Sequence, residues 1–96
     1  MKGEESRQAL WEAIRRGDIA TVATDHCPFN SFEKDWGKDD FSKIPNGCAG
    51  IENMYPYMLS AANTGKISFE KAVELCSFNP ARIFGLKSKG SLAVGK

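Results

Sequence analysis

The stretch Ile19-Ala20-Thr21-Val22-Ala23-Thr24, followed at once by Asp25-His26-Cys27-Pro28, decides how the fold is interpreted. Its first six residues are uncharged and mostly β-branched, which predicts a strand buried on both faces, as in a parallel sheet. A helical pattern precedes it, because apolar residues recur there at spacings of three and four, with Ser6 as a candidate cap and Gly17 as a stop. A helix, a short turn and a buried strand together predict an α/β fold.

The rest of the chain alternates between one long loop and three helical segments. Residues 26–50 carry turn-forming residues, a charge cluster and scattered aromatic side chains, which predicts a long, functional loop packed against something. The expected helices cover residues 51–64, 68–77 and 80–85, and Asn79 is expected to cap the last one with Pro80 at its first position. Residues 91–94 are apolar and predict a short strand.

The composition excludes several classes of protein. Among 96 residues, 13 basic and 12 acidic side chains leave a net charge of +1, which argues against nucleic-acid or membrane-surface binding driven by bulk charge. No apolar run is long enough for a membrane span, and the charged N-terminus lacks a signal-peptide core. Three widely spaced cysteines predict no disulfide framework and favour a reducing, cytoplasmic compartment.

Asp25 is the strongest candidate for chemistry, because active sites form at the carboxyl ends of parallel strands. Its carboxylate fits a metal ligand or a general base, and the other interpretation is that it caps the following turn. His26 is the only histidine, so a histidine-rich metal site within this chain is excluded, and a hydrogen-bonded structural role is favoured for it. Residues 44–47 predict a turn that either presents backbone groups to a ligand or is a plain connection.

The sequence resembles the dihydropyrimidinase and hydantoinase family of cyclic amidohydrolases, within the amidohydrolase superfamily. The similarity lies in Thr24-Asp25-His26-Cys27-Pro28-Phe29, in the run Asp40-Phe41-Ser42-Lys43-Ile44-Pro45-Asn46-Gly47 and in Asn79-Pro80-Ala81-Arg82. The first and last of these segments are shared more widely, including with dihydroorotases and allantoinases.

The resemblance implies a metal-dependent (β/α)8 TIM barrel with a small β-sandwich. Residues 1–88 would then be the end of the barrel domain, with its last strand at 19–24, and residues 89–96 the start of a β-sandwich strand. Asp25 matches an aspartate that binds one metal of a two-zinc centre and moves a proton during hydrolysis of a cyclic amide. Asn46 matches a loop residue whose backbone contacts the substrate ring. Complete family members are commonly homotetramers.

The chain departs from the family pattern in two respects. Cys48-Ala49 and Glu52-Asn53-Met54 are unusual there, which leaves the ring open among dihydropyrimidine, hydantoin and the substrates of dihydroorotases or allantoinases. The remaining metal ligands are absent, and a barrel needs about 250 residues, so the chain is expected to be a C-terminal-side fragment that is inactive alone. The alternatives are a non-enzymatic interaction scaffold of the same family and an independent small α/β domain.

Overall fold

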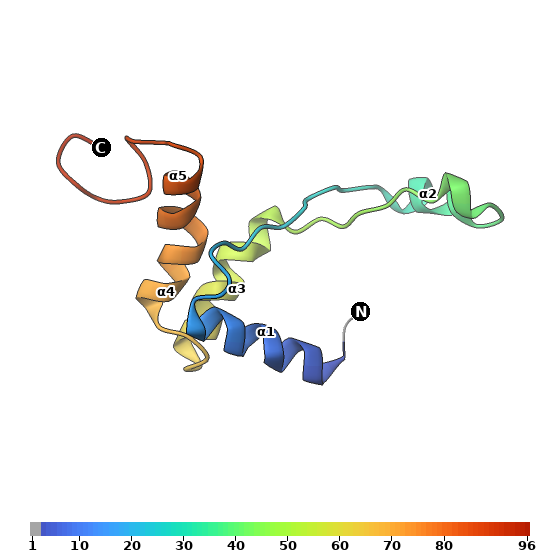
Figure 1. Ribbon diagram of the computed structural model, residues 1–96. Coiled ribbons are helices and arrows are strands. Elements are labelled where there is room, and N and C mark those ends of the chain that lie inside the picture. Colours follow the sequence, from blue (N-terminus) through green and yellow to red (C-terminus); the bar gives the residue numbers. More distant parts are fainter. Residues whose placement is uncertain (1–2) are drawn as a thin grey trace. The chain divides into compact units, whose positions relative to one another are not determined.

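The computed structural model describes residues 3–96 and separates them into two compact units. Residues up to Ala23 together with Tyr55–Lys96 form the first unit, and Thr24–Met54 form the second. The first unit is helical, and the second is a long loop with short helical turns (Figure 1). Within the described residues, no helix combines the length and the apolar character that a membrane crossing requires.

Four helices build the first unit: α1 (Glu4–Arg16), α3 (Ile51–Asn63), α4 (Phe69–Val73) and α5 (Asn79–Ile83). The first four residues of α3, Ile51–Met54, belong to the second unit, and the rest of the helix belongs to the first. The core joins α1, α3, α4 and the turn after α4 through buried side chains: Trp11, Ile14, Met58, Ala61, Ala62, Ile67, Ala72 and Leu75. Burial of this apolar set is the main force that holds the helices together.

Two of the helix ends lie where glycines predict them. Gly17 ends α1 and Gly65 ends α3, with φ of 86° and 81°, a left-handed conformation that other residues adopt at a cost. After each glycine the next amide reaches back into the helix, from Asp18 to the Ala13 carbonyl and from Lys66 to the Ala61 carbonyl, both at 2.9 Å. The predicted start was wrong, because α1 begins at Glu4 and Gly3, not Ser6, occupies the capping position.

Residues 69–83 form one continuous helix where two were expected. Between α4 and α5 lies a π-helical segment, η3 (Glu74–Phe78), and Asn79 has ordinary helical angles. Proline lacks an N–H and its ring crowds the carbonyl four residues earlier, so the widened π turn is the arrangement that accommodates Pro80. Asn79 therefore caps nothing, and its buried side chain instead donates from Nδ2 to the Ala20 carbonyl at 2.8 Å.

The strands expected at 19–24 and 91–94 are absent from the described residues, which form no sheet. A parallel strand requires a neighbouring strand for its hydrogen bonds, and residues 3–96 supply none. The segment at 19–24 is held by helix groups instead: the Val22 amide donates to the Leu75 carbonyl at 3.3 Å, beside the Asn79 contact. Ile19 and Val22 pack against the helical core.

The second unit contains three short helical turns: α2 (Ser31–Lys34), η1 (Asp35–Gly37) and η2 (Phe41–Lys43). A capping box starts α2, with Asn30 and Glu33 each accepting a backbone amide of the other. Asp40 starts η2 by accepting from the Ser42 amide and hydroxyl, and these hydrogen bonds lower the pKa of the Asp40 carboxyl. The loop predicted over 26–50 is therefore built from defined local turns.

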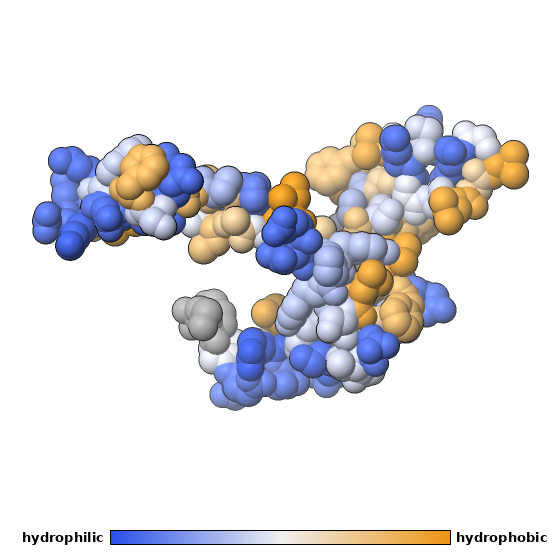
Figure 2. Space-filling model, turned by 180° about the vertical axis from the view of Figure 1, so that it is seen from behind, coloured by the Kyte–Doolittle hydropathy of each residue, from blue (hydrophilic) through white to orange (hydrophobic). Residues whose placement is uncertain are grey.

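Large apolar side chains remain on the surface of both units (Figure 2). Phe41 in the second unit is 86% exposed, and Phe84 and Leu92 in the first are 77% and 110% exposed. Isolated exposed apolar residues are ordinary, but this number of aromatic and branched side chains is typical of surface that packs against other protein.

Candidate functional site

Asp25 stands apart from its neighbours in backbone geometry. Its φ is 50°, and it is the one non-glycine residue with positive φ in the described chain. Aspartate adopts this conformation more readily than most residues, yet such outliers concentrate at functional sites. The side chain is exposed, and among residues 3–96 its carboxylate accepts no hydrogen bond and forms no ion pair.

The turn that follows Asp25 is capped by the residue before it. Thr24 Oγ1 accepts the His26 amide at 3.0 Å, which is the contact expected of a turn-capping side chain. The interpretation that Asp25 caps this turn is therefore wrong, and its carboxylate oxygens face solvent. The role of Asp25 as a metal ligand or general base stays a prediction.

His26 has the structural role that the sequence favoured. Its Nδ1 accepts the amides of Gly50 and Ile51, at 3.0 and 3.2 Å, so the imidazole caps the N-terminus of α3. An accepting Nδ1 carries no proton, which places the proton of the neutral ring on Nε2. His26 also pairs with Cys48 in a parallel bridge, and the Cys27 amide donates to the Cys48 carbonyl at 3.1 Å. These contacts join the two ends of the loop, residues 26–27 and residues 48–51.

Removing the imidazole should weaken the contact between the two ends of the loop. His26→Ala is expected to speed hydrogen exchange at the Gly50 and Ile51 amides about fivefold or more, because a lost helix cap costs about 1 kcal/mol. His26→Asn is the matched control, since an amide oxygen at the same position is also a capping acceptor and should retain part of the protection. Equal exchange in the wild type and His26→Ala would contradict the capping role.

Asn46 lies in a turn whose neighbouring carbonyls are both engaged. Lys34 Nζ donates to the Pro45 carbonyl at 2.6 Å and to the Gly47 carbonyl at 2.7 Å, while Asn46 itself is exposed. Among the described residues no hydrogen bond to the backbone or side chain of Asn46 is found. The lysine was not identified from the sequence, where the one available signal was the Asn30–Glu33 capping pair that begins its helix.

The pairing of His26 with Cys48 places the two predicted site residues, Asp25 and Asn46, next to paired positions of the loop. Asp25 immediately precedes one partner of the pair, and Asn46 lies two residues before the other. No hydrogen bond joins Asp25 and Asn46, and within residues 3–96 no three histidine, cysteine or acidic side chains are grouped as a metal site. The described residues thus supply one carboxylate and one presented backbone segment.

The three cysteines divide between the two units, with Cys76 in the first and the other two in the second. Burial raises the pKa of the Cys76 thiol, which packs against the helical core as its position on an apolar face predicts. Cys27 and Cys48 are free and exposed in the second unit.

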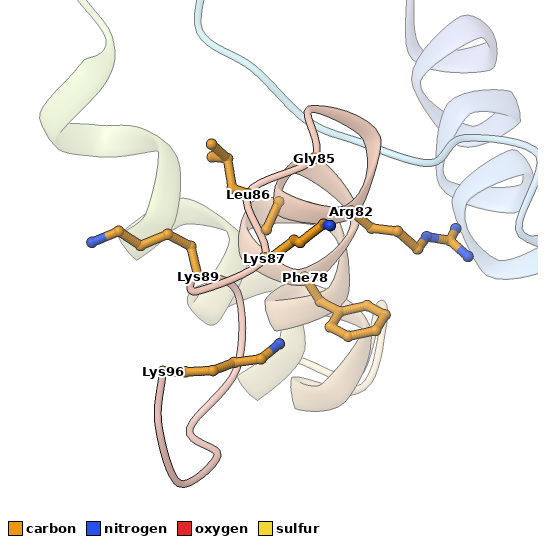
Figure 3. Close-up of a pocket in the computed structure, with 8 residues that line it drawn as sticks. Phe78, Arg82, Gly85, Leu86, Lys87, Lys89 and Lys96 are labelled. Carbon is orange, nitrogen blue, oxygen red and sulfur yellow. The ribbon is translucent and has the colours of Figure 1, made fainter.

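A cavity of about 430 Å³ lies in the first unit, between α5 and the residues that follow it (Figure 3). Neither Asp25 nor Asn46 lines it, and its lining contains no acidic, histidine or cysteine side chain. The Arg82 and Lys89 side chains extend outward in opposite directions in Figure 3, so their charges do not converge on one point. The lining residues are Phe78, Ala81, Arg82, Gly85, Leu86, Lys87, Lys89 and Lys96.

Comparison with known proteins identifies the class. The model of the amidohydrolase family matches residues 1–96, and the chain therefore belongs to the amidohydrolase family. It is 41% identical to a D-hydantoinase of Streptomyces coelicolor, covering 99% of this chain and 21% of the relative. It is 38% identical to a dihydroorotase of Halobacterium salinarum, covering 100% of this chain and 22% of that protein.

The fold is shared with a solved enzyme structure. The crystal structure of dihydropyrimidinase from Brevibacillus agri superposes with a TM-score of 0.94 at 38% identity, covering 100% of this chain and 22% of that structure. The similarity to hydantoinases and dihydropyrimidinases expected from the sequence is thus confirmed. The chain spans about a fifth of the length of the curated relatives it matches.

Proposed function

We propose that this chain is the C-terminal-side part of a metal-dependent cyclic amidohydrolase that opens an amide bond of a dihydropyrimidine or hydantoin ring. The observation that carries the proposal is Asp25, an exposed carboxylate without a partner in the described chain, held in a left-handed conformation inside the segment that resembles hydantoinases. A residue held in a costly conformation with an unused charged group is typical of a binding or catalytic position.

Asp25 fits one ligand position of a zinc centre. Zinc accepts carboxylate oxygens and needs three or four protein ligands, so the remaining ligands would come from outside residues 3–96. When bound, the metal ions would make hydroxide available near neutral pH and polarise the scissile carbonyl. In this proposal the Asp25 carboxylate takes the proton of the attacking water and delivers it to the departing ring nitrogen, as a general base and then a general acid.

Asn46 would orient the substrate ring through its backbone. A cyclic ureide or imide presents alternating N–H and C=O groups, which match the unused N–H and C=O of an exposed peptide segment. Asn46 offers both groups, whereas the adjacent carbonyls of Pro45 and Gly47 are occupied by Lys34.

The surroundings of the site are proposed to follow the barrel fold of the relatives. Residues 19–24 would become the last barrel strand when neighbouring strands are present, and residues 89–96 would begin a β-sandwich strand. The exposed Phe84, Leu92 and Val94 side chains support a larger surrounding structure, because burial of such groups is favourable. We further propose that the complete enzyme works in the cytoplasm as a homo-oligomer, with a tetramer as the expected form.

The activity is tested by assaying the protein that contains this chain and the 96-residue chain alone. The longer protein is expected to open dihydrouracil or hydantoin, to lose turnover after chelation and to regain it with zinc. The isolated chain should show no turnover, because Asp25 alone cannot hold a zinc ion and the other ligands that the metal requires are missing from residues 3–96. A longer protein that opens neither ring, or an isolated chain that is active, would contradict the proposal.

Two alternatives give different results in the same assay. A dihydroorotase would prefer dihydroorotate, and the 38% identical dihydroorotase is the observation that keeps this ring in the test. A non-enzymatic scaffold would open no ring and would bind no zinc. The exposed, unpartnered Asp25 favours an enzyme over the scaffold, because a scaffold has no need of a free carboxylate in a costly backbone conformation.

A further inference from the structure

Lys34 makes a convergent set of contacts for a lysine on a loop. Its ammonium donates to two carbonyls, of Pro45 and Gly47, and lies 4.9 Å from the centre of the Phe29 ring. Two short charge-assisted hydrogen bonds and a cation–π contact together occupy the ammonium group. A surface lysine that only kept the protein soluble would leave its ammonium in water, so this arrangement has a structural purpose.

The two carbonyls flank Asn46, and this determines which backbone groups are held. The Pro45 carbonyl and the Asn46 amide belong to one planar peptide unit and point in opposite directions. Drawing the carbonyl toward Lys34 therefore aims the Asn46 N–H away from the lysine. The second bond holds the Gly47 carbonyl on the same ammonium, so both sides of Asn46 are anchored to one point.

The lysine is itself held in place by the rest of the second unit. It is the last residue of α2, whose first turn is fixed by the Asn30–Glu33 capping box. The 44–47 turn is pressed against the loop at Gly47, where an added Cβ would lie 2.5 Å from Cys27 Cβ. Local contacts therefore fix both Lys34 and the 44–47 turn that it holds.

We propose that Lys34 is a positioning residue that holds the Asn46 backbone in the orientation that receives the substrate ring. This inference rests on the proposed function, since it assigns Lys34 to the ring-binding segment of that enzyme. Lys34 does not touch the reacting atoms, and its effect is exerted through the Pro45–Asn46 and Gly47–Cys48 peptide units. A loss of this orientation misplaces the ring, and displacements of about 1 Å can lower rates by about a hundredfold.

The test compares Lys34→Met with Lys38→Met in the longer protein that contains this chain. Methionine keeps most of the apolar stem and removes the ammonium. Lys38 is an exposed lysine of the same loop, and among the described residues its side chain forms no hydrogen bond or ion pair. Lys34→Met is expected to lower kcat/KM at least tenfold, mainly through a higher KM, with zinc content unchanged. Lys38→Met should match the wild type.

A second measurement does not depend on activity. Hydrogen exchange followed by mass spectrometry should show faster exchange of the peptide spanning residues 43–50 in Lys34→Met, with or without substrate. If the wild type opens no ring but exchange of this peptide is faster in Lys34→Met, the proposed function is wrong, whereas the structural role of Lys34 in holding the turn is supported. Wild-type kcat/KM in Lys34→Met, or unchanged exchange in that peptide, would overturn the positioning role.

Discussion

Replacing Asp25 by asparagine is expected to lower kcat/KM of the longer protein by about a thousandfold, within the range for loss of a general acid–base group. Asparagine has nearly the same shape and also tolerates the left-handed conformation, so φ of 50° can be kept while the charge is removed. The same change should reduce bound zinc, because a neutral amide is a poorer ligand than a carboxylate. Steady-state kinetics and metal analysis of the purified protein measure both effects.

Two further variants separate the carboxylate from the backbone conformation. Asp25→Gly adopts positive φ without cost and should be as inactive as Asp25→Asn, because both lack the carboxylate. Asp39→Asn is the matched control, since Asp39 is an exposed aspartate of the same loop and should keep wild-type activity. Activity within threefold of the wild type in Asp25→Asn would show that this residue is neither ligand nor proton carrier.

Features set by neighbouring residues were predictable from the sequence. Gly17 ends its helix as expected and Gly65 ends α3 in the same way, because a left-handed helix terminus depends on the residue itself and on amides one turn away. The structural role of His26 was also favoured, although its partners, the amides of Gly50 and Ile51, are more than twenty residues distant. The sequence indicated that a lone histidine forms hydrogen bonds, but its hydrogen-bond partners are known only from the folded structure.

Features set by tertiary contacts were not predictable in this way. Asn79 before Pro80 matches a helix start, but a distant backbone carbonyl at Ala20 competes for its side chain and the helix continues. The 19–24 segment has strand composition, but strand formation depends on neighbours that residues 3–96 do not provide. Lys34 carried no signal as a site residue, because its partners lie 11 and 13 positions away in a turn without regular spacing.

Gly47→Ala is expected to open the loop locally and to lower kcat/KM of the longer protein at least tenfold. Gly47 has φ of 131°, and an added Cβ would lie 2.5 Å from Cys27 Cβ and 2.8 Å from the Cys27 carbonyl oxygen. Both strain and collision with backbone act at once, for a local cost of about 2–4 kcal/mol. Since residues 24–54 form their own compact unit, the cost should be relieved by opening the turn and not by unfolding the helices.

Gly17→Ala is the control that separates backbone strain from lack of room. Gly17 also has positive φ, at 86°, but nothing lies within 4 Å of a Cβ built there. Gly17→Ala should lower the free energy of unfolding by only about 1 kcal/mol, measured as a small decrease in melting temperature with normal kcat/KM. Limited proteolysis should cut Gly47→Ala within residues 27–47 faster than either Gly17→Ala or the wild type. Equal cleavage and equal activity in the two variants would mean that the close contact between Gly47 and Cys27 does not hold the substrate turn in place.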